Sequence, residues 1–344
     1  MAPLPATHAR PGDADAILTV ENLSVAFSRG GQKLSAVNGV SLTLRAGETL
    51  AVVGESGCGK SVTGNAIMGL LRNRSARVGG RIMFEGRDLL QLGDRQMAAI
   101  RGNRIAMVFQ EPMTALNPLM KIGLQVAEPL MRHRGLGRAE AERHAAGLLE
   151  RVHIPDPGAW LSRYPHEMSG GMRQRVMIAM AIACEPSVLI ADEPTTALDV
   201  TIQAQILHLL AELQRAYGMA MLLVTHDLGV VAEVAHRVSV LYAGTVVEEA
   251  PVADLFARPA HPYTRGLMQA MPRLDREILD ADLVEIPGLV PALAEPPGFC
   301  PFQPRCTHSV AACLQARPLL EGIGPRHRVA CVQKQRVMET ADAG

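Results

Sequence analysis

The sequence predicts an α/β fold in which an antiparallel β subdomain precedes a parallel β-sheet, a helical subdomain is inserted into that sheet domain, and a loop-rich extension follows it. Three observations lead to this prediction. Apolar runs such as "TLAVVG" and "SVLIADE" are typical of strands covered on both faces. Residues 112–183 carry Ala, Leu, Arg and Glu at helical spacing. Beyond about residue 250, repeated prolines exclude long helices and central strands.

Length and composition indicate a main domain with an appendage. The 344 residues exceed the usual size of one compact domain. Hydrophobic residues make up 48% of the chain and 34 basic residues balance 34 acidic ones, which argues against disorder and against a nucleic-acid binder that relies on bulk positive charge. We expect a disordered tail over residues 1–15, one domain over 16–255 with its helical subdomain at about 112–183, and an extension over 256–344.

Neither a secretion signal nor a membrane span is predicted. The N-terminal "MAPLPATHARPGDADA" lacks the continuous apolar stretch of a signal peptide. The longest weakly charged run, Val176 to Ala191, is interrupted by Glu185 and Pro186, so it is too short to cross a bilayer. We therefore expect a cytosolic chain that reaches a membrane only through a partner.

The strands are predicted in order along the chain. Residues 18–27 and 36–44 alternate apolar and polar side chains, as half-buried strands do, and a glycine-containing turn follows at 45–48. The parallel sheet begins near Thr49. "SVLIADE" and "MAMLLVTHD" are two further buried strands, and "RVSVLYAG" with "TVVEEA" is typical of a hairpin.

The stretch "VVGESGCGKSVTG" is the first candidate site, because it fits G-x-x-x-x-G-K-[ST] between a predicted strand and a predicted helix. Glycines let backbone N–H groups converge on an anion, and the helix directs its positive dipole end to the same place. The alternative is a glycine-rich turn that binds nothing. The residues expected to contact a nucleotide are Gly54, Glu55, Ser56, Gly57, Cys58, Gly59, Lys60, Ser61 and Val62.

Two carboxylates end the predicted strand "VLIADE". Asp192, together with the Ser61 hydroxyl, can hold Mg²⁺, and Glu193 can face an attacking water. An Asp-Glu pair after a strand is also a common helix cap. This motif therefore indicates a nucleotide site only because the same chain contains the glycine-rich loop.

The stretch "MSGGMRQRV" predicts a second anion site. Ser169, Gly170 and Gly171 stand at a helix start, where they offer a hydroxyl, backbone donors and the helix dipole. A chain needs only one such site per nucleotide. The economical explanation is that this turn covers the nucleotide of another subunit.

From Leu18 to Ala250 these motifs resemble the ATP-binding cassette (ABC) ATPases, with "MSGGM" similar to the family signature although Met168 stands where Leu is usual. The resemblance implies a P-loop NTPase core of the RecA-like kind. It also implies a second ATPase subunit, identical or paralogous, paired head to tail. Each ATP would then lie between one subunit's phosphate loop and the signature motif of the other.

The resemblance assigns further roles on matching positions. Gln110 in "VFQEP" is similar to the glutamine that senses Mg²⁺ and water, and His226 in "LLVTHD" to the histidine that contacts the γ-phosphate. Asp199 in "TALD" is similar to the residue that communicates across the dimer, and Phe27 to the aromatic that stacks on adenine. Each also has an ordinary interpretation: a helix cap for His226, a polar strand end for Gln110, and core packing for Phe27.

The tail resembles the extension of ATPases that serve dipeptide and oligopeptide importers, a group that includes nickel and glutathione uptake systems. "HPYTRGLMQAMP" and "GFCPFQPRC" carry this resemblance, and the chain is more similar to the first of two paired ATPases. It implies two transmembrane permease subunits, an extracytoplasmic solute-binding protein and a peripheral position on the cytoplasmic face of the membrane, without nucleic acid as a partner.

Four of the six cysteines cluster in the tail with the spacing C-x5-C-x6-C-x17-C, at Cys300, Cys306, Cys313 and Cys331. Such a cluster in a cytosolic chain indicates metal before disulfides. The spacing alone does not choose between zinc and iron–sulfur. Some members of the resembled group carry a [4Fe–4S] cluster here, which makes it the favoured expectation, with zinc or free thiols as alternatives.

Two rival functions are considered. A soluble cassette ATPase acting on chromosomes or ribosomes would carry a long coiled coil or a second cassette, and this chain has neither. A metal-binding regulatory module would leave the first 250 residues without a role.

Overall fold

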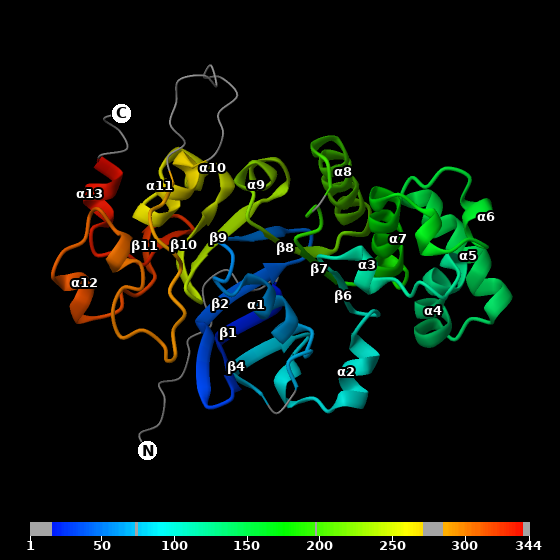
Figure 1. The fold of residues 1–344 in the computed structure, drawn as a ribbon, viewed down its shortest axis with the longest axis horizontal. Coiled ribbons are helices and arrows are strands. Elements are labelled where there is room, and N and C mark those ends of the chain that lie inside the picture. Colours follow the sequence, from blue (N-terminus) through cyan, green and yellow to red (C-terminus); the bar gives the residue numbers. More distant parts are fainter. Residues whose placement is uncertain (1–15, 73–74, 197, 271–284, 340–344) are drawn as a thin grey trace.

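The computed structural model describes residues 16–72, 75–196, 198–270 and 285–339, so the tail predicted over 1–15 lies outside the described residues. The described chain forms two β-sheets, a helical region on one side and a C-terminal extension on the other (Figure 1). The predicted α/β class is confirmed.

Sheet A is a four-stranded antiparallel sheet with the order β2-β1-β4-β5. Its strands are β1 (Ala16–Arg29), β2 (Gln32–Arg45), β4 (Ala76–Phe84) and β5 (Arg87–Asp88). The sequence predicted β1 and β2 but not β4, whose two central glycines obscure the strand pattern. A side chain at Gly80 would come within 2.6 Å of the Asn22 carbonyl oxygen, so glycine lets β4 pass the bulge in β1.

Sheet B has eight strands in the order β11-β12-β10-β9-β3-β8-β7-β6. Pairing is parallel from β9 to β6 and antiparallel from β11 to β9. Every residue of β3, β7 and β8 is buried, as their continuous apolar runs predicted. The bounds are β3 (Thr49–Val53), β6 (Ile105–Val108), β7 (Val188–Asp192), β8 (Ala220–Thr225), β9 (Arg237–Tyr242), β10 (Thr245–Pro251), β11 (Glu321–Gly324) and β12 (His327–Val329).

The helices and 3₁₀ turns of the described residues fall into two groups along the chain. The helices that precede β7 in the chain are α1 (Lys60–Ile67), α2 (Asp94–Ile100), α3 (Pro112–Ala115), α4 (Ile122–Arg134), α5 (Arg138–Arg151), α6 (Pro157–Trp160) and α7 (Gly170–Ile182), with 3₁₀ turns η1 (Leu89–Gln91) and η2 (Pro165–Glu167). The helices that follow β7 are α8 (Val200–Tyr217), α9 (Leu228–Val234), α10 (Val252–Ala257), α11 (Pro262–Gln269), α12 (Ala312–Gln315) and α13 (Lys334–Glu339), with one 3₁₀ turn, η3 (Gln303–Arg305).

The helical region is anchored to the sheet by one continuous apolar core. Val126 of α4, Leu149 of α5 and Ile178 of α7 are fully buried in the same cluster as residues of β7 and α8. In Figure 1 this region (green) lies beyond the β6 edge of sheet B, while the extension (orange and red) lies at the opposite end. Because α7 belongs to both the helical region and this core, its N-terminus has a fixed position relative to the sheet.

The extension is loop-rich, as predicted, but it also adds strands β11 and β12 to sheet B. Its anchor is Glu248 of β10, a fully buried carboxylate. This carboxylate accepts hydrogen bonds from the backbone N–H groups of Ala260 (2.7 Å) and His261 (3.0 Å), and His327 Nε2 lies 2.8 Å from Glu248 Oε1. A buried charge needs such partners, so the contacts fix the extension to the domain.

The search for membrane-spanning helices covered the described residues, and none of their helices has both the length and the apolar character to cross a bilayer.

A buried arginine joins the two sheets. The Arg237 side chain is 6% exposed and forms ion pairs with Glu48 and with Glu249, the latter at 3.3 Å. It also donates a hydrogen bond to the Thr43 carbonyl oxygen of β2, at 2.6 Å. Arg237 therefore neutralises two carboxylates and bonds sheet A to sheet B.

We expect Arg237→Ala to lower the free energy of unfolding by about 3 kcal/mol, because it leaves the buried Glu249 carboxylate without its ion-pair partner and removes the hydrogen bond to β2. Urea unfolding followed by circular dichroism measures this loss. The matched control is Arg138→Ala, which removes an exposed ion pair with Glu142 on α5 and should change stability by no more than about 0.5 kcal/mol. Equal stability of the two variants would contradict the linking role of Arg237.

Candidate nucleotide-binding site

The glycine-rich loop connects the end of buried strand β3 to the start of α1. A side chain at Gly54 would come within 2.3 Å of the Leu241 carbonyl oxygen, and one at Gly59 within 2.5 Å of the Ala36 carbonyl oxygen. Gly59 also has φ +101°, in the left-handed region that favours glycine. The loop is thus enclosed by β2 and β9, which leaves room only for main chain.

Lys60 is the first residue of α1, and its side chain folds back over this loop. It is 5% exposed, and its Nζ donates to the carbonyl oxygens of Gly54 (2.7 Å) and Glu55 (3.0 Å). The positive charge therefore stands beside the loop and the helix N-terminus, where an anion is favoured.

The other predicted loop residues differ in exposure. Ser56 and Gly57 are exposed, Val62 packs on the core beneath sheet A, and Cys58 is fully buried, which raises the pKa of its thiol. Glu55 turns away from the loop towards the C-terminal extension, where Arg305 contacts its carboxylate. Sequence reasoning missed this contact, because 250 residues separate the two side chains.

Ser61 and Asp192 meet although 131 residues separate them. The Ser61 hydroxyl donates to Asp192 Oδ1 at 2.8 Å. Burial raises the pKa of Asp192 and the neighbouring Glu193 raises it further, while Ser61 and Lys60 act in the opposite direction. A hydroxyl and a partly buried carboxylate are the hard oxygen ligands that suit Mg²⁺, so these residues fit the expected ion.

Glu193 is held by Gln110, by Thr196 of its own turn, and by residues at the end of β8. Its backbone has φ +45°, a left-handed conformation that costs a non-glycine residue about 1–3 kcal/mol and is concentrated at functional sites. Its N–H donates to the Val224 carbonyl oxygen of β8 at 2.8 Å. Its carboxylate accepts hydrogen bonds from Gln110 Nε2 and Thr196 Oγ1, both at 2.9 Å, and His226 Nδ1 lies 3.7 Å away.

Gln110, Glu193 and His226, predicted from separate motifs, are therefore brought together in the structure. Thr196 belongs to the same group, but sequence reasoning missed it. A threonine three residues after a carboxylate is an ordinary turn residue, so the sequence alone carries no signal for it.

The signature turn lies at the N-terminus of α7. Ser169 Oγ accepts the N–H of Met172 at 3.3 Å, and Ser169 and Gly170 are exposed. A side chain at Gly171 would come within 2.8 Å of Ile202 in α8. The turn thus combines a helix cap with an exposed main-chain surface.

Asp199 and Phe27 have structural roles in this chain. Asp199 is the N-cap of α8, because its Oδ1 accepts the Ile202 N–H at 2.9 Å, and it is exposed. Phe27 lies in β1 opposite Leu34 and Ala76 and packs, partly buried, on the core beneath sheet A. The packing of Phe27 matches its ordinary interpretation, while the capping role of Asp199 was not predicted, and the inferred roles of both residues at the nucleotide stay predictions.

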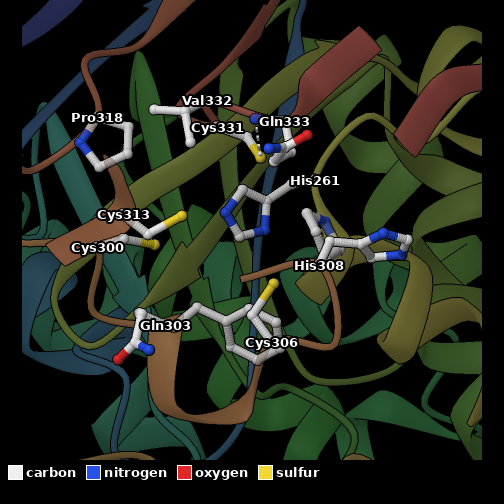
Figure 2. A pocket seen from close by; sticks show the side chains of 12 residues that line it. His261, Cys300, Gln303, Cys306, His308, Cys313, Pro318, Cys331, Val332 and Gln333 are labelled. Carbon is white, nitrogen blue, oxygen red and sulfur yellow. Dashed lines mark hydrogen bonds between the residues drawn. The ribbon is translucent and has the colours of Figure 1, made fainter. Parts of the chain in front are cut away.

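The four clustered cysteines line one small cavity in the extension, together with His261 (Figure 2). Their sulfur atoms point towards its centre. Burial raises the pKa of Cys300 and Cys306, and that of Cys331 to about 12. Within the described part of the chain, however, no three His, Cys, Asp or Glu side chains form a group that could hold a metal ion.

Comparison with known proteins assigns the chain to a family. A family model described as ABC transporter matches residues 37–196, and one described as the C-terminal region of oligopeptide/dipeptide transporters matches residues 247–313. The chain is 51% identical to the dipeptide transport ATP-binding protein DppD of Bacillus subtilis, over 95% of this chain and 98% of that protein. It is 50% identical to the oligopeptide transport ATP-binding protein OppD of Salmonella typhimurium, over 93% and 95%.

A solved structure agrees with these matches. The ATP-binding cassette MJ0796, as a dimer bound to ADP and Pi in a post-hydrolysis state, superposes with a TM-score of 0.61 and 30% sequence identity. The match covers 68% of this chain and 98% of that one. The chain is therefore a member of the ABC transporter ATPase family, in its oligopeptide and dipeptide group.

Proposed function

We propose that this chain is the ATP-hydrolysing subunit of an importer for dipeptides or oligopeptides. The observation that carries the proposal is the position of the Glu193 carboxylate, held by Gln110 and Thr196 with His226 at 3.7 Å, close in sequence to the Ser61–Asp192 pair. The names of the relatives, which are dipeptide and oligopeptide transport proteins, support the class of solute.

The phosphate-binding loop holds the triphosphate of ATP in this proposal. Main-chain N–H groups between Gly54 and Val62 surround the phosphates, and Lys60 releases its carbonyl partners to contact the β- and γ-phosphates. Ser61, Asp192 and Gln110 would hold Mg²⁺, which would neutralise charge that builds up on the phosphate oxygens.

Glu193 and His226 act on the transferred phosphoryl group. Glu193 orients a water molecule for in-line attack and accepts its proton, while Gln110 and Thr196 fix the carboxylate. His226, whose side chain is exposed, contacts the γ-phosphate. Positioning and charge stabilisation supply most of the rate in such reactions.

A second ATPase subunit, identical or paralogous, completes the site. The turn of Ser169, Gly170 and Gly171, whose first two residues are exposed, covers the γ-phosphate bound to the partner, and Asp199 communicates across the pair. The dimeric form of the solved relative supports this arrangement. Phe27 contributes its ring face to the adenine.

The pair acts on membrane-embedded partners. We propose the domain over residues 16–255, including the helical subdomain at about 112–183, as the motor and residues 256–344 as the group-specific extension. Two permease subunits receive the motion at the cytoplasmic face of the membrane, and an extracytoplasmic binding protein delivers the solute. Import of nickel or glutathione by the same machinery is the second candidate, while action on nucleic acid or ribosomes has no support among the relatives described above.

The test is ATP hydrolysis and uptake by vesicles that contain the assembled transporter. We expect dipeptides or oligopeptides to stimulate both activities and nickel and glutathione to stimulate neither. Glu193→Gln should lower kcat by about 10²- to 10⁴-fold, because the amide cannot accept the proton of water, while ATP binding is retained.

The matched control is Glu212→Gln, which changes an exposed carboxylate of α8 and should hydrolyse ATP at the normal rate. Full hydrolysis by Glu193→Gln would remove this residue from the reaction. Stimulation by nickel or glutathione alone would reject peptide import and leave the ATPase assignment intact.

We further propose that the cysteine cavity holds a [4Fe–4S] cluster. Four thiols directed into one cavity match the ligand number and softness that such a cluster needs. A cluster carries its thiolates at the corners of a larger core than a single ion does, which is compatible with the lack of a compact single-metal group among the described side chains. Its role would be to fix the fold of the extension.

Anaerobically purified protein should contain iron and sulfide and show broad visible absorbance. Cys306→Ser should lose most of this absorbance, because it removes one of the four thiolates, whereas Cys184→Ser, a buried thiol outside the cavity, should retain it. Zinc in a one-to-one ratio with protein, without sulfide, would reject the cluster and indicate a zinc site. Protein that contains neither metal would reject both the cluster and the zinc site.

A further inference from the structure

The C-terminal extension contacts the phosphate-binding loop through a buried arginine. Arg305 donates from Nη1 to Glu55 Oε2 at 2.8 Å and from Nη2 to Glu55 Oε1 at 3.0 Å. The Arg305 side chain is 6% exposed and that of Glu55 29%. Two parallel, charge-assisted hydrogen bonds of this kind fix both the distance and the orientation of the carboxylate.

Arg305 is itself held rigidly by the extension. Its Nε donates to the Pro287 carbonyl oxygen at 2.8 Å and its Nη2 to the Ile286 carbonyl oxygen at 3.0 Å. The guanidinium also lies 5.7 Å and 5.9 Å from the ring centres of Tyr242 and Phe302. Such an arginine is preorganised, so it positions Glu55 and does not follow it.

A second residue of the extension holds the main chain at the same position. The N–H of Glu55 donates to the hydroxyl oxygen of Tyr263 at 2.8 Å. Tyr263 is fully buried, and its ring packs edge to face on Tyr242, with 4.7 Å between ring centres. Burial raises the pKa of Tyr263, which keeps the hydroxyl neutral.

These contacts lead directly to the lysine of the loop. The carbonyl oxygens of Gly54 and Glu55, which flank the amide held by Tyr263, are the two acceptors of Lys60 Nζ. A shift of Glu55 would therefore displace Lys60 and the first turn of the loop together.

We propose that Arg305 and Tyr263 are positioning residues of the nucleotide site, through which the C-terminal extension holds the phosphate-binding loop in the conformation that accepts ATP. This inference rests on the proposed ATPase function. Its structural consequence is that one short segment of the extension serves both features, because Arg305 contacts Glu55 while Phe302 and Cys306 line the cysteine cavity.

The test compares ATP affinity and steady-state hydrolysis among Arg305→Ala, Arg305→Lys and Tyr263→Phe in the full-length ATPase pair. We expect KM for ATP to rise about tenfold in Arg305→Ala, as for the loss of a hydrogen bond to a charged group, with kcat nearly unchanged. Arg305→Lys keeps the charge but not the paired geometry and should recover part of the affinity. Tyr263→Phe should also raise KM.

The control is Lys334→Ala, which removes an exposed ion pair with Glu321 elsewhere in the extension and should leave KM unchanged. Adding Glu55→Ala to Arg305→Ala should produce little further rise in KM, because both changes remove the same contact. Melting temperatures identify variants that fail to fold. If Arg305→Ala fails to fold, the KM of Arg305→Lys tests the inference in its place.

The outcomes separate this inference from the proposed function. Wild-type protein that neither binds nor hydrolyses ATP would reject the function itself. Normal wild-type activity with the same KM in the folded Arg305 variants and Lys334→Ala would overturn the inference. A fall in kcat at unchanged KM would also overturn it, because the extension would then act on a later step than ATP binding.

Discussion

The steric closure of the glycine-rich loop is the constraint on which the site depends. Strand β3 is buried along its whole length, and at its end Gly54 and Gly59 approach carbonyl oxygens of β9 and β2 more closely than any side chain allows. Because these walls leave space for main chain alone, only glycine at both positions lets the loop follow this path, which places its amides beside the start of α1. Lys60 then has two carbonyl oxygens as its fixed partners in this structure.

The order of the strands in sheet B places the other predicted site residues beside this loop. Strands β3, β7 and β8 are parallel neighbours, so their carboxyl ends meet at one edge of the sheet. That edge gathers Lys60, Asp192, Glu193 and His226, which are far apart in sequence. The extension approaches the same loop from β9 and β10, and Arg305 meets Glu55 there. An appendage on the far side of sheet B thus contributes to the nucleotide site.

The parts predicted from sequence are those encoded locally. The glycine spacing of the loop, the apolar runs of β3, β7 and β8, and Ser169 at the start of α7 each lie within a short segment of the sequence. Thr196, Tyr263 and Arg305 could not be predicted, because their role comes from partners that only the fold brings near. Strand β4 was missed because its glycines weaken the alternating pattern, and β11 and β12 because a proline-rich composition obscures short strands.

The most direct test of the account is calorimetric titration of the purified ATPase pair with MgATP, comparing the wild type with Lys60→Ala and with the surface variant Lys33→Ala. We expect tight binding by the wild type and by Lys33→Ala. For Lys60→Ala we expect binding weaker by roughly ten- to a hundredfold, because this variant loses charged hydrogen bonds to phosphate. Equal affinity of all three proteins would contradict the claim that this loop grips the triphosphate.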